Sequence, residues 1–127
     1  MVGVIVALGL FVFGGRLYIA SRTPEWIAQL QDPDPIIRRE AALWLNELAP
    51  PAPDVLDALM AALQDDYVGV RQQAAHGLGK FGPRGREAIP LLLETLNDDD
   101  EAVRFNAAGS LRAIGHDPTV HTLHVDP

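Results

Sequence analysis

Apolar residues recur at intervals of three and four positions along most of the chain after residue 23, which is the spacing of one face of an α-helix. Clusters of Pro, Gly, Asp and Asn interrupt this pattern. The pattern predicts an all-α protein built from three pairs of helices. The first helix of each pair is expected at 24–31, 53–64 and 86–96, and the second at 35–48, 67–81 and 101–114.

The three predicted pairs are copies of one pattern that repeats every 33 residues. In each copy an Asp is followed six residues later by an Arg, and three residues after that by a pair of alanines. A fixed period of this length is typical of a solenoid, in which each unit buries its apolar face against its neighbours. We therefore predict a short α-solenoid of three units, at 24–52, 53–85 and 86–115.

Local signals support the predicted helix ends. Asp34 and Thr23 each precede a proline, which is the pattern of an N-cap followed by the first helical position. Gly82 and Gly115 are expected to end second helices, since glycine is favoured just past a helix C-terminus. Residues 21–23 then form a short linker in front of the first unit.

The repeated acidic and basic positions predict a ladder along the stack. Each Asp lies near the N-terminus of a second helix, where negative charge is favoured, and each Arg lies about one turn inside. The arginines could pair with turn carboxylates of the same or the adjacent unit. A stacking residue must recur in every unit, whereas a catalytic residue need not. The ladder residues are Asp32, Arg38, Asp65, Arg71, Asp98 and Arg104.

The second helices are expected to have one buried and one outward face. In the first unit the buried residues are Ile37, Ala41, Leu45 and Leu48, which follow helical spacing. The outward columns mix apolar, polar and charged side chains, a composition that suits a protein interface. The predicted partner-binding residues are Arg39, Leu43, Trp44, Gln72, His76, Phe105 and Arg112.

Trp44 differs in size from its equivalents. The later units have Gly77 and Ser110 in that column, so a small residue is expected where units pack. No earlier unit crowds the position in the first repeat. We predict that Trp44 packs against a membrane segment, the membrane interface or a partner helix.

The first 20 residues have the character of a membrane anchor. Residues 2–15 are uncharged and almost wholly apolar, and extension to residue 20 approaches the length of about 20 residues that spans a bilayer. Nothing basic precedes the apolar run and no good cleavage site ends it, which favours a retained anchor over a cleaved signal or a soluble helix. Arg16 and Arg22 favour a cytoplasmic location for the repeats. The membrane residues are predicted to include Val4, Leu8, Phe11, Phe13, Arg16 and Tyr18.

Composition excludes several classes of function. The chain has 17 acidic and 10 basic residues, a net charge of −7, which argues against nucleic-acid binding because that requires a basic surface. It has no cysteine, so disulfides, thiolate catalysis and Cys-based metal sites are excluded. No phosphate loop or nucleophile motif is present. We predict no catalytic residue and no cofactor.

The tail at 116–127 contains three of the four histidines, His116, His121 and His124. Two interpretations stay open. The tail could cover the end of the last helix through its apolar residues, as terminal repeats require. Alternatively, the three histidines could bind Zn or Ni. The first interpretation is favoured, and no metal site is predicted.

The segments DPDPIIRREAALWLNEL and DDDEAVRFNAAGSLRAIG resemble HEAT repeats, most closely the short bacterial type of phycobilisome lyases. The resemblance covers about residues 23–115. It implies an α-solenoid with the second helices on the concave side, but it is weak for function because such repeats serve many roles. The paired His-Glu motifs of HEAT-repeat hydroxylases are absent.

The resemblance and the anchor together predict a single-pass membrane protein that acts as a protein-interaction scaffold. Its partners would be the lipid bilayer and protein subunits of a larger membrane complex, respiratory or photosynthetic, of which it would be an accessory or assembly subunit. The alternative is a lyase-like or chaperone subunit that handles a tetrapyrrole.

Overall fold

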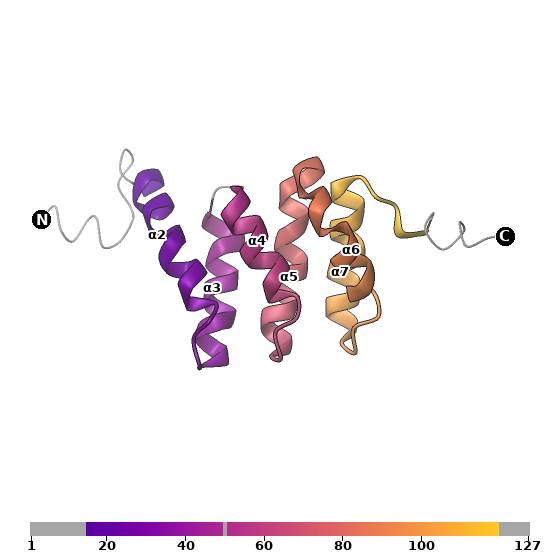
Figure 1. Cartoon of the computed structure of the whole chain (residues 1–127), viewed down its shortest axis with the longest axis horizontal. Coiled ribbons are helices and arrows are strands. Elements are labelled where there is room, and N and C mark those ends of the chain that lie inside the picture. Colours follow the sequence, from indigo (N-terminus) through magenta and orange to yellow (C-terminus); the bar gives the residue numbers. More distant parts are fainter. Residues whose placement is uncertain (1–14, 50, 120–127) are drawn as a thin grey trace, which may run out of the picture.

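The computed structural model describes residues 15–49 and 51–119, with side chains from residue 22 onward, and this part of the chain is helical. The helices follow one another along a stack (Figure 1). The first unit contains α2 (Gly15–Gln29) and α3 (Pro35–Leu48), and the second contains α4 (Pro53–Ala62) and α5 (Val68–Leu78). The 3₁₀ segment η1 (Gly79–Ala88) continues from α5 and joins the second unit to the third, which contains α6 (Ile89–Thr95) and α7 (Glu101–Ile114).

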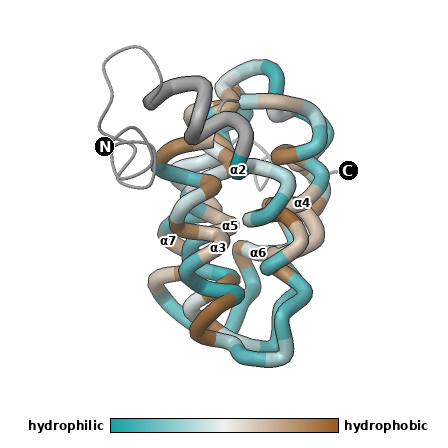
Figure 2. The backbone as a smooth tube through the Cα atoms, turned by 90° about the vertical axis from the view of Figure 1, so that its left-hand side faces the viewer, coloured by the Kyte–Doolittle hydropathy of each residue, from teal (hydrophilic) through white to brown (hydrophobic). Residues whose placement is uncertain are grey.

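The helices form two layers. Helix α5 contacts α3 on one side and α7 on the other, while α4 packs on α5 and α6 packs on α7. The view along the stack shows α3, α5 and α7 in one layer and α4 and α6 in the other (Figure 2). The second helices of the units therefore lie side by side, as a solenoid requires.

Side-chain and glycine caps set several helix ends. The Asp34 carboxylate accepts a hydrogen bond from the Ile36 N–H at 2.9 Å, so Asp34 is the N-cap of α3. Asp100 has the same role in α7, where its carboxylate accepts from the Val103 N–H at 2.9 Å. Gly115 ends α7 with a φ of 101°, a left-handed conformation that favours glycine. These ends agree with the sequence analysis.

The first helix differs from its prediction. Residues 21–23, expected as a linker, lie inside α2, and Thr23 is a buried helical residue instead of an N-cap. Pro24 therefore lies within the helix, where its missing N–H removes one hydrogen bond of the ladder of backbone bonds.

The second connection also differs. The helix predicted at 67–81 ends as an α-helix at Leu78, and 3₁₀ geometry follows through residue 88. Within this segment Gly82 has a φ of 56° and turns the chain, as glycine can do without strain. The first helix of the third unit is consequently shorter than expected, beginning at Ile89 with Pro90 in its first turn.

The core runs through all three units and contains leucine and alanine from every helix pair, with valine from the second and third pairs. Leu45, Leu78 and Leu111 occupy one column and are at most 2% exposed. Ile37 and Leu48 were predicted to be buried, but they are 36% and 39% exposed. Their equivalents in the later units are at most 7% exposed, and no unit precedes the first one in the described part of the chain.

The predicted anchor at 1–20 lies outside the described residues, apart from the backbone of residues 15–20 at the start of α2. Among the helices that the structure describes, none combines the length and the apolar character needed to cross a membrane.

Candidate protein interaction surface

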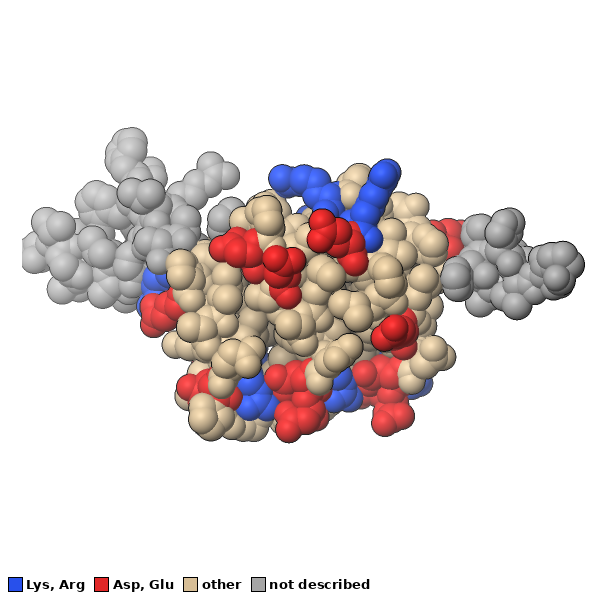
Figure 3. Space-filling view, viewed as in Figure 1, with Lys and Arg blue, Asp and Glu red and all other residues tan. Residues whose placement is uncertain are grey.

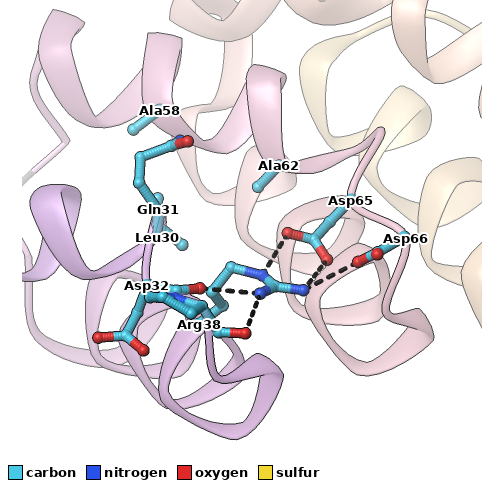
Figure 4. Close-up of a pocket in the computed structure, with 9 residues that line it drawn as sticks. Leu30, Gln31, Asp32, Arg38, Ala58, Ala62, Asp65 and Asp66 are labelled. Carbon is cyan, nitrogen blue, oxygen red and sulfur yellow. Dashed lines mark hydrogen bonds and ion pairs between the residues drawn. The ribbon is translucent and has the colours of Figure 1, made fainter.

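The Arg38 guanidinium is fully hydrogen-bonded between the first two units (Figure 4). Its Nε and Nη2 donate to the two carboxylate oxygens of Asp65 at 2.9 and 3.1 Å. Nη2 also donates to Asp66 Oδ1 at 2.8 Å, and Nη1 donates to the carbonyl oxygens of Asp32 and Pro33 at 2.8 and 3.2 Å. Since a guanidinium has five N–H donors and five acceptors are present, Arg38 has no donor left for a ligand.

Arg71 repeats this arrangement between the second and third units. Its Nε and Nη2 donate to Asp98 at 2.9 and 3.2 Å, and its Nη1 donates to the carbonyl oxygens of Asp65 and Asp66 at 3.0 and 3.2 Å. Each arginine thus ties the turn of its own unit to the carboxylate of the next. Such bidentate, charge-assisted contacts are the stronger kind of hydrogen bond.

Ladder contacts shift the pKa values of the paired groups. A hydrogen bond to Asp65 raises the pKa of Arg38. Partial burial alone would raise the pKa of Asp65, but hydrogen bonds from Arg38 and the Tyr67 N–H outweigh it and lower that pKa. The pKa of Asp98 is lowered against the same burial effect, by Arg71 and a backbone N–H. The carboxylates are therefore held in their charged form.

Close contacts between the second helices require small residues. A Cβ atom on Gly77 would collide with the Asn46 side chain, and one on Gly79 would lie 2.8 Å from Ser110 Oγ. Asn46 is buried and donates to the Gln73 carbonyl oxygen at 2.7 Å. Arg112, which was predicted to face outward, shares its column with Asn46 and Gly79, and these two residues face the next unit.

The outward surface of α5 and α7 contains a shallow groove with a volume of about 310 Å³. His76 and Phe105, both predicted partner-binding residues, line this groove together with Lys80. Gly109 contributes no side chain, and a Cβ atom there would meet nothing within 4 Å. The groove is therefore an open, mainly apolar hollow beside an aromatic ring that is 76% exposed, features that suit an interface with an aromatic anchor.

Other predicted partner-binding residues have structural contacts. Gln72 donates to Asp100 Oδ2 at 3.0 Å, which lowers the pKa of Asp100 and links two units. Arg39 is exposed, but its Cδ lies close to Gly69 of the next unit. Leu43 is half-buried on α3. Gln72 in particular holds the stack together and is not a free surface residue.

The two ends of the stack expose apolar or bulky residues. On α3, Trp44 is 44% exposed beside Ile37 and Leu48. We call Ile37, Trp44 and Leu48 the N-terminal end face. Sequence reasoning identified Trp44 but missed the other two residues. All three are exposed at an end of the stack that no unit precedes within the described residues. On α7, Phe105 and Arg112 are exposed for the corresponding reason, because no fourth unit follows in the described part.

Charge is unevenly distributed over the described surface. The lower edge in Figure 3, formed by the turns within the helix pairs, alternates between acidic and basic side chains. The exposed acidic residues of the other layer are Asp54, Asp57, Glu87 and Glu94. The alternating edge corresponds to the ladder, so its arginines do not form a basic patch.

The histidine tail is only partly described. His116 is half-buried and its N–H donates to the Leu111 carbonyl oxygen at 2.8 Å, whereas His121 and His124 lie outside the described residues. Within residues 15–49 and 51–119, no group of three His, Cys, Asp or Glu is arranged to hold a metal ion.

Comparison with protein families gives a match to the model for HEAT repeats, over residues 23–112 and again over residues 70–123. A search among curated proteins found no match. The matched region spans the helix pairs, the ladder and the groove described above.

Proposed function

The chain belongs to the family of HEAT-repeat proteins, and on that premise we propose that it is a protein-interaction scaffold held at a membrane by residues 1–20. In this proposal it is a non-catalytic accessory or assembly subunit of a larger membrane complex, respiratory or photosynthetic. The apolar sequence of residues 2–15 supports the membrane part.

The observation that carries the binding role is the exposure of large apolar side chains. Trp44 and Phe105 are 44% and 76% exposed and lie at opposite ends of the stack. Aromatic residues are enriched at interfaces, because they bury a large area at low entropic cost. The ladder arginines, in contrast, are used to hold units together. A binding role therefore fits the exposed residues better than catalysis at the ladder does.

Affinity purification of the tagged full chain from solubilised membranes tests this proposal. We expect a stoichiometric protein partner, and we expect Trp44→Ser to lower its recovery by at least about 10-fold if Trp44 is an interface anchor. Glu94→Ser, an exposed change on α6, is the matched control. Recovery of a bound pigment or haem without a protein partner would contradict the scaffold and favour tetrapyrrole handling.

Topology can be tested separately because the chain has no cysteine. A single Ala61→Cys substitution places a thiol at an exposed position of α4. We propose that the repeats lie on the cytoplasmic side, so a membrane-impermeant maleimide should label this thiol only after the membrane is opened. Labelling of intact cells would overturn that orientation, and recovery of the chain in the soluble fraction would overturn the anchor.

A further inference from the structure

Arg104 is the last arginine of the ladder. Like the other two it donates to a backbone carbonyl oxygen, but its Nε and Nη2 atoms bind no carboxylate of the described residues. Arg104 Nη1 donates to the Asp98 carbonyl oxygen at 2.7 Å, just as Arg71 Nη1 donates to the carbonyl oxygen of Asp65 at 3.0 Å. In Arg38 and Arg71 the Nε and Nη2 atoms then bind a carboxylate of the following unit. No acidic side chain of the described residues lies within salt-bridge distance of Arg104. Arg104 is therefore held in position with its carboxylate-binding edge unoccupied by that part of the chain.

The residues around Arg104 belong to columns that contact the following unit elsewhere. Phe105 has the position of Gln72, which binds Asp100, and Arg112 has the position of Gly79, which packs on Ser110. Ala108 has the position of Ala42 and Ala75, which are fully buried. We call Arg104, Phe105, Ala108 and Arg112 the C-terminal end face. It is a unit-binding face on which the described chain places no unit.

We propose that the C-terminal end face binds an acidic segment of a partner protein, in which an Asp or Glu carboxylate occupies the Nε–Nη2 edge of Arg104. This inference rests on the proposed scaffold role and names its recognition chemistry. Charge complementarity supports it at Arg104, whose Nε–Nη2 edge binds no carboxylate of the described residues and which precedes the exposed Phe105. Arg112, in contrast, already acts on the nearby carboxylate of Asp117, whose pKa is lowered by hydrogen bonds from Thr119 and by the charge of Arg112. The partner carboxylate would repeat the bidentate contacts that Asp65 and Asp98 make.

A second copy of the chain is a poorer occupant than a different protein. Asp32 of a second copy could approach Arg104, but the rest of the two end faces would not fit. Between the units of one chain a large residue meets a small one, as with Asn46 against Gly77 and Arg39 against Gly69. Continuation of the stack would instead bring Arg112 against Trp44, and Phe105 against Ile36. Such overpacking is unfavourable, so the bulky end residues oppose head-to-tail assembly.

Site-specific photo-crosslinking in native membranes tests the inference. The full chain carries benzoylphenylalanine in place of Phe105, or, in a parallel sample, in place of His76 in the groove. We expect the probe at position 105 to crosslink one discrete partner protein next to an Asp or Glu, as located by mass spectrometry. Arg104→Gln should lower that yield at least about 10-fold, whereas Arg84→Gln, an exposed control, should leave it unchanged.

Exchanging the charges of Arg104 and the partner carboxylate tests whether these two groups pair. Arg104→Glu should abolish the crosslink, and replacement of the partner carboxylate by Arg should restore it. A crosslink to a second copy of the chain, a crosslink to residues 116–127 of the same chain, or one that is indifferent to Arg104→Gln would overturn the inference. If position 76 crosslinks a protein and position 105 does not, the end-face inference fails while the scaffold stands. If neither position crosslinks a protein, the end-face inference fails, and the scaffold also fails if affinity purification recovers no protein partner. Thermal unfolding followed by circular dichroism checks that each variant is folded.

Discussion

Arginines in one column of the repeat have different surroundings according to the unit that follows them. Arg71 binds a carboxylate of the next unit, with side-chain exposures of 19% for the Arg and 13% for the Asp98 partner. Arg104 occupies the same column, but within the described chain it binds only a carbonyl oxygen. The main difference between these two positions is therefore the carboxylate contact, beside one further carbonyl contact at Arg71.

Arg71→Ala should lower the free energy of unfolding by about 2–3 kcal/mol, because it leaves the partly buried Asp98 carboxylate without its bidentate partner. Arg104→Ala should cost less than about 1 kcal/mol, because this half-buried arginine pairs with no carboxylate of the described chain and its removal leaves no such group without a partner. Urea denaturation of both variants measures the two values. Equal losses would mean that the carboxylate contact contributes no stability.

Acid should weaken the ladder. The pKa values of Asp65 and Asp98 are lowered in the folded state by their hydrogen bonds, whereas an unfolded Asp titrates near about 3.9. The resulting stabilisation is complete above that value and is lost as the pH falls through the lower folded pKa. We expect the urea midpoint to decrease below about pH 4.

Asp65→Asn provides the control for the acid prediction, because an amide does not titrate in this range. The variant should be less stable than the natural chain at pH 7, and its midpoint should decline less steeply in acid. Parallel pH profiles of the two proteins would show that the ladder carboxylates do not cause the acid sensitivity.

At the scale of the helices, packing between neighbouring second helices depends on the absence of a Cβ atom. α3 and α5 approach so closely that Asn46 occupies the space beside Gly77. Gly109 in α7 instead lines the open groove, where a Cβ atom would meet no neighbour within 4 Å. A side chain is therefore excluded at Gly77 but has room at Gly109.

Gly77→Ala should destabilise the protein by about 1–3 kcal/mol, because the new methyl group overpacks the contact with Asn46. Gly109→Ala should instead stabilise it by about 0.4–1 kcal/mol, because alanine restricts the unfolded chain and meets no neighbour in the fold. Thermal or urea unfolding measures both effects. A double-mutant cycle with Asn46→Ala should recover part of the Gly77→Ala loss, and strict additivity would contradict the proposed collision.

At the scale of the whole molecule, stability is expected to depend on how many neighbours a unit has. Helix α5 packs between α3 and α7, whereas within the described stack α3 and α7 each have one second helix beside them. In a linear array the terminal units open more readily than the central one.

Hydrogen exchange followed by mass spectrometry should therefore find the slowest amide exchange in α5. Exchange in α7 should be faster, because its end face has no unit on it in the described chain. Binding of a partner to the C-terminal end face should slow exchange in α7 selectively. Uniform protection of all helices would show instead that the stack unfolds as a single cooperative unit.

The sequence by itself determined the helical repeat, its 33-residue period, the caps at Asp34 and Gly115, and the residue types of the ladder. These features follow from local spacing and from columns that recur in every unit. The same columns also indicated His76 and Phe105, which the structure brings to one groove.

Only the tertiary structure decided what each column meets. Gln72 looked like a surface residue, but its side chain bonds to the next unit, as the side chain of Asn46 also does. Ile37 looked like a core residue and is exposed, because the unit that would cover it is absent from the described stack. Periodicity reports which residues share a helix face, whereas burial also depends on whether a neighbour is present at that face. The end faces are therefore where the repeat pattern predicts least and the three-dimensional arrangement adds most.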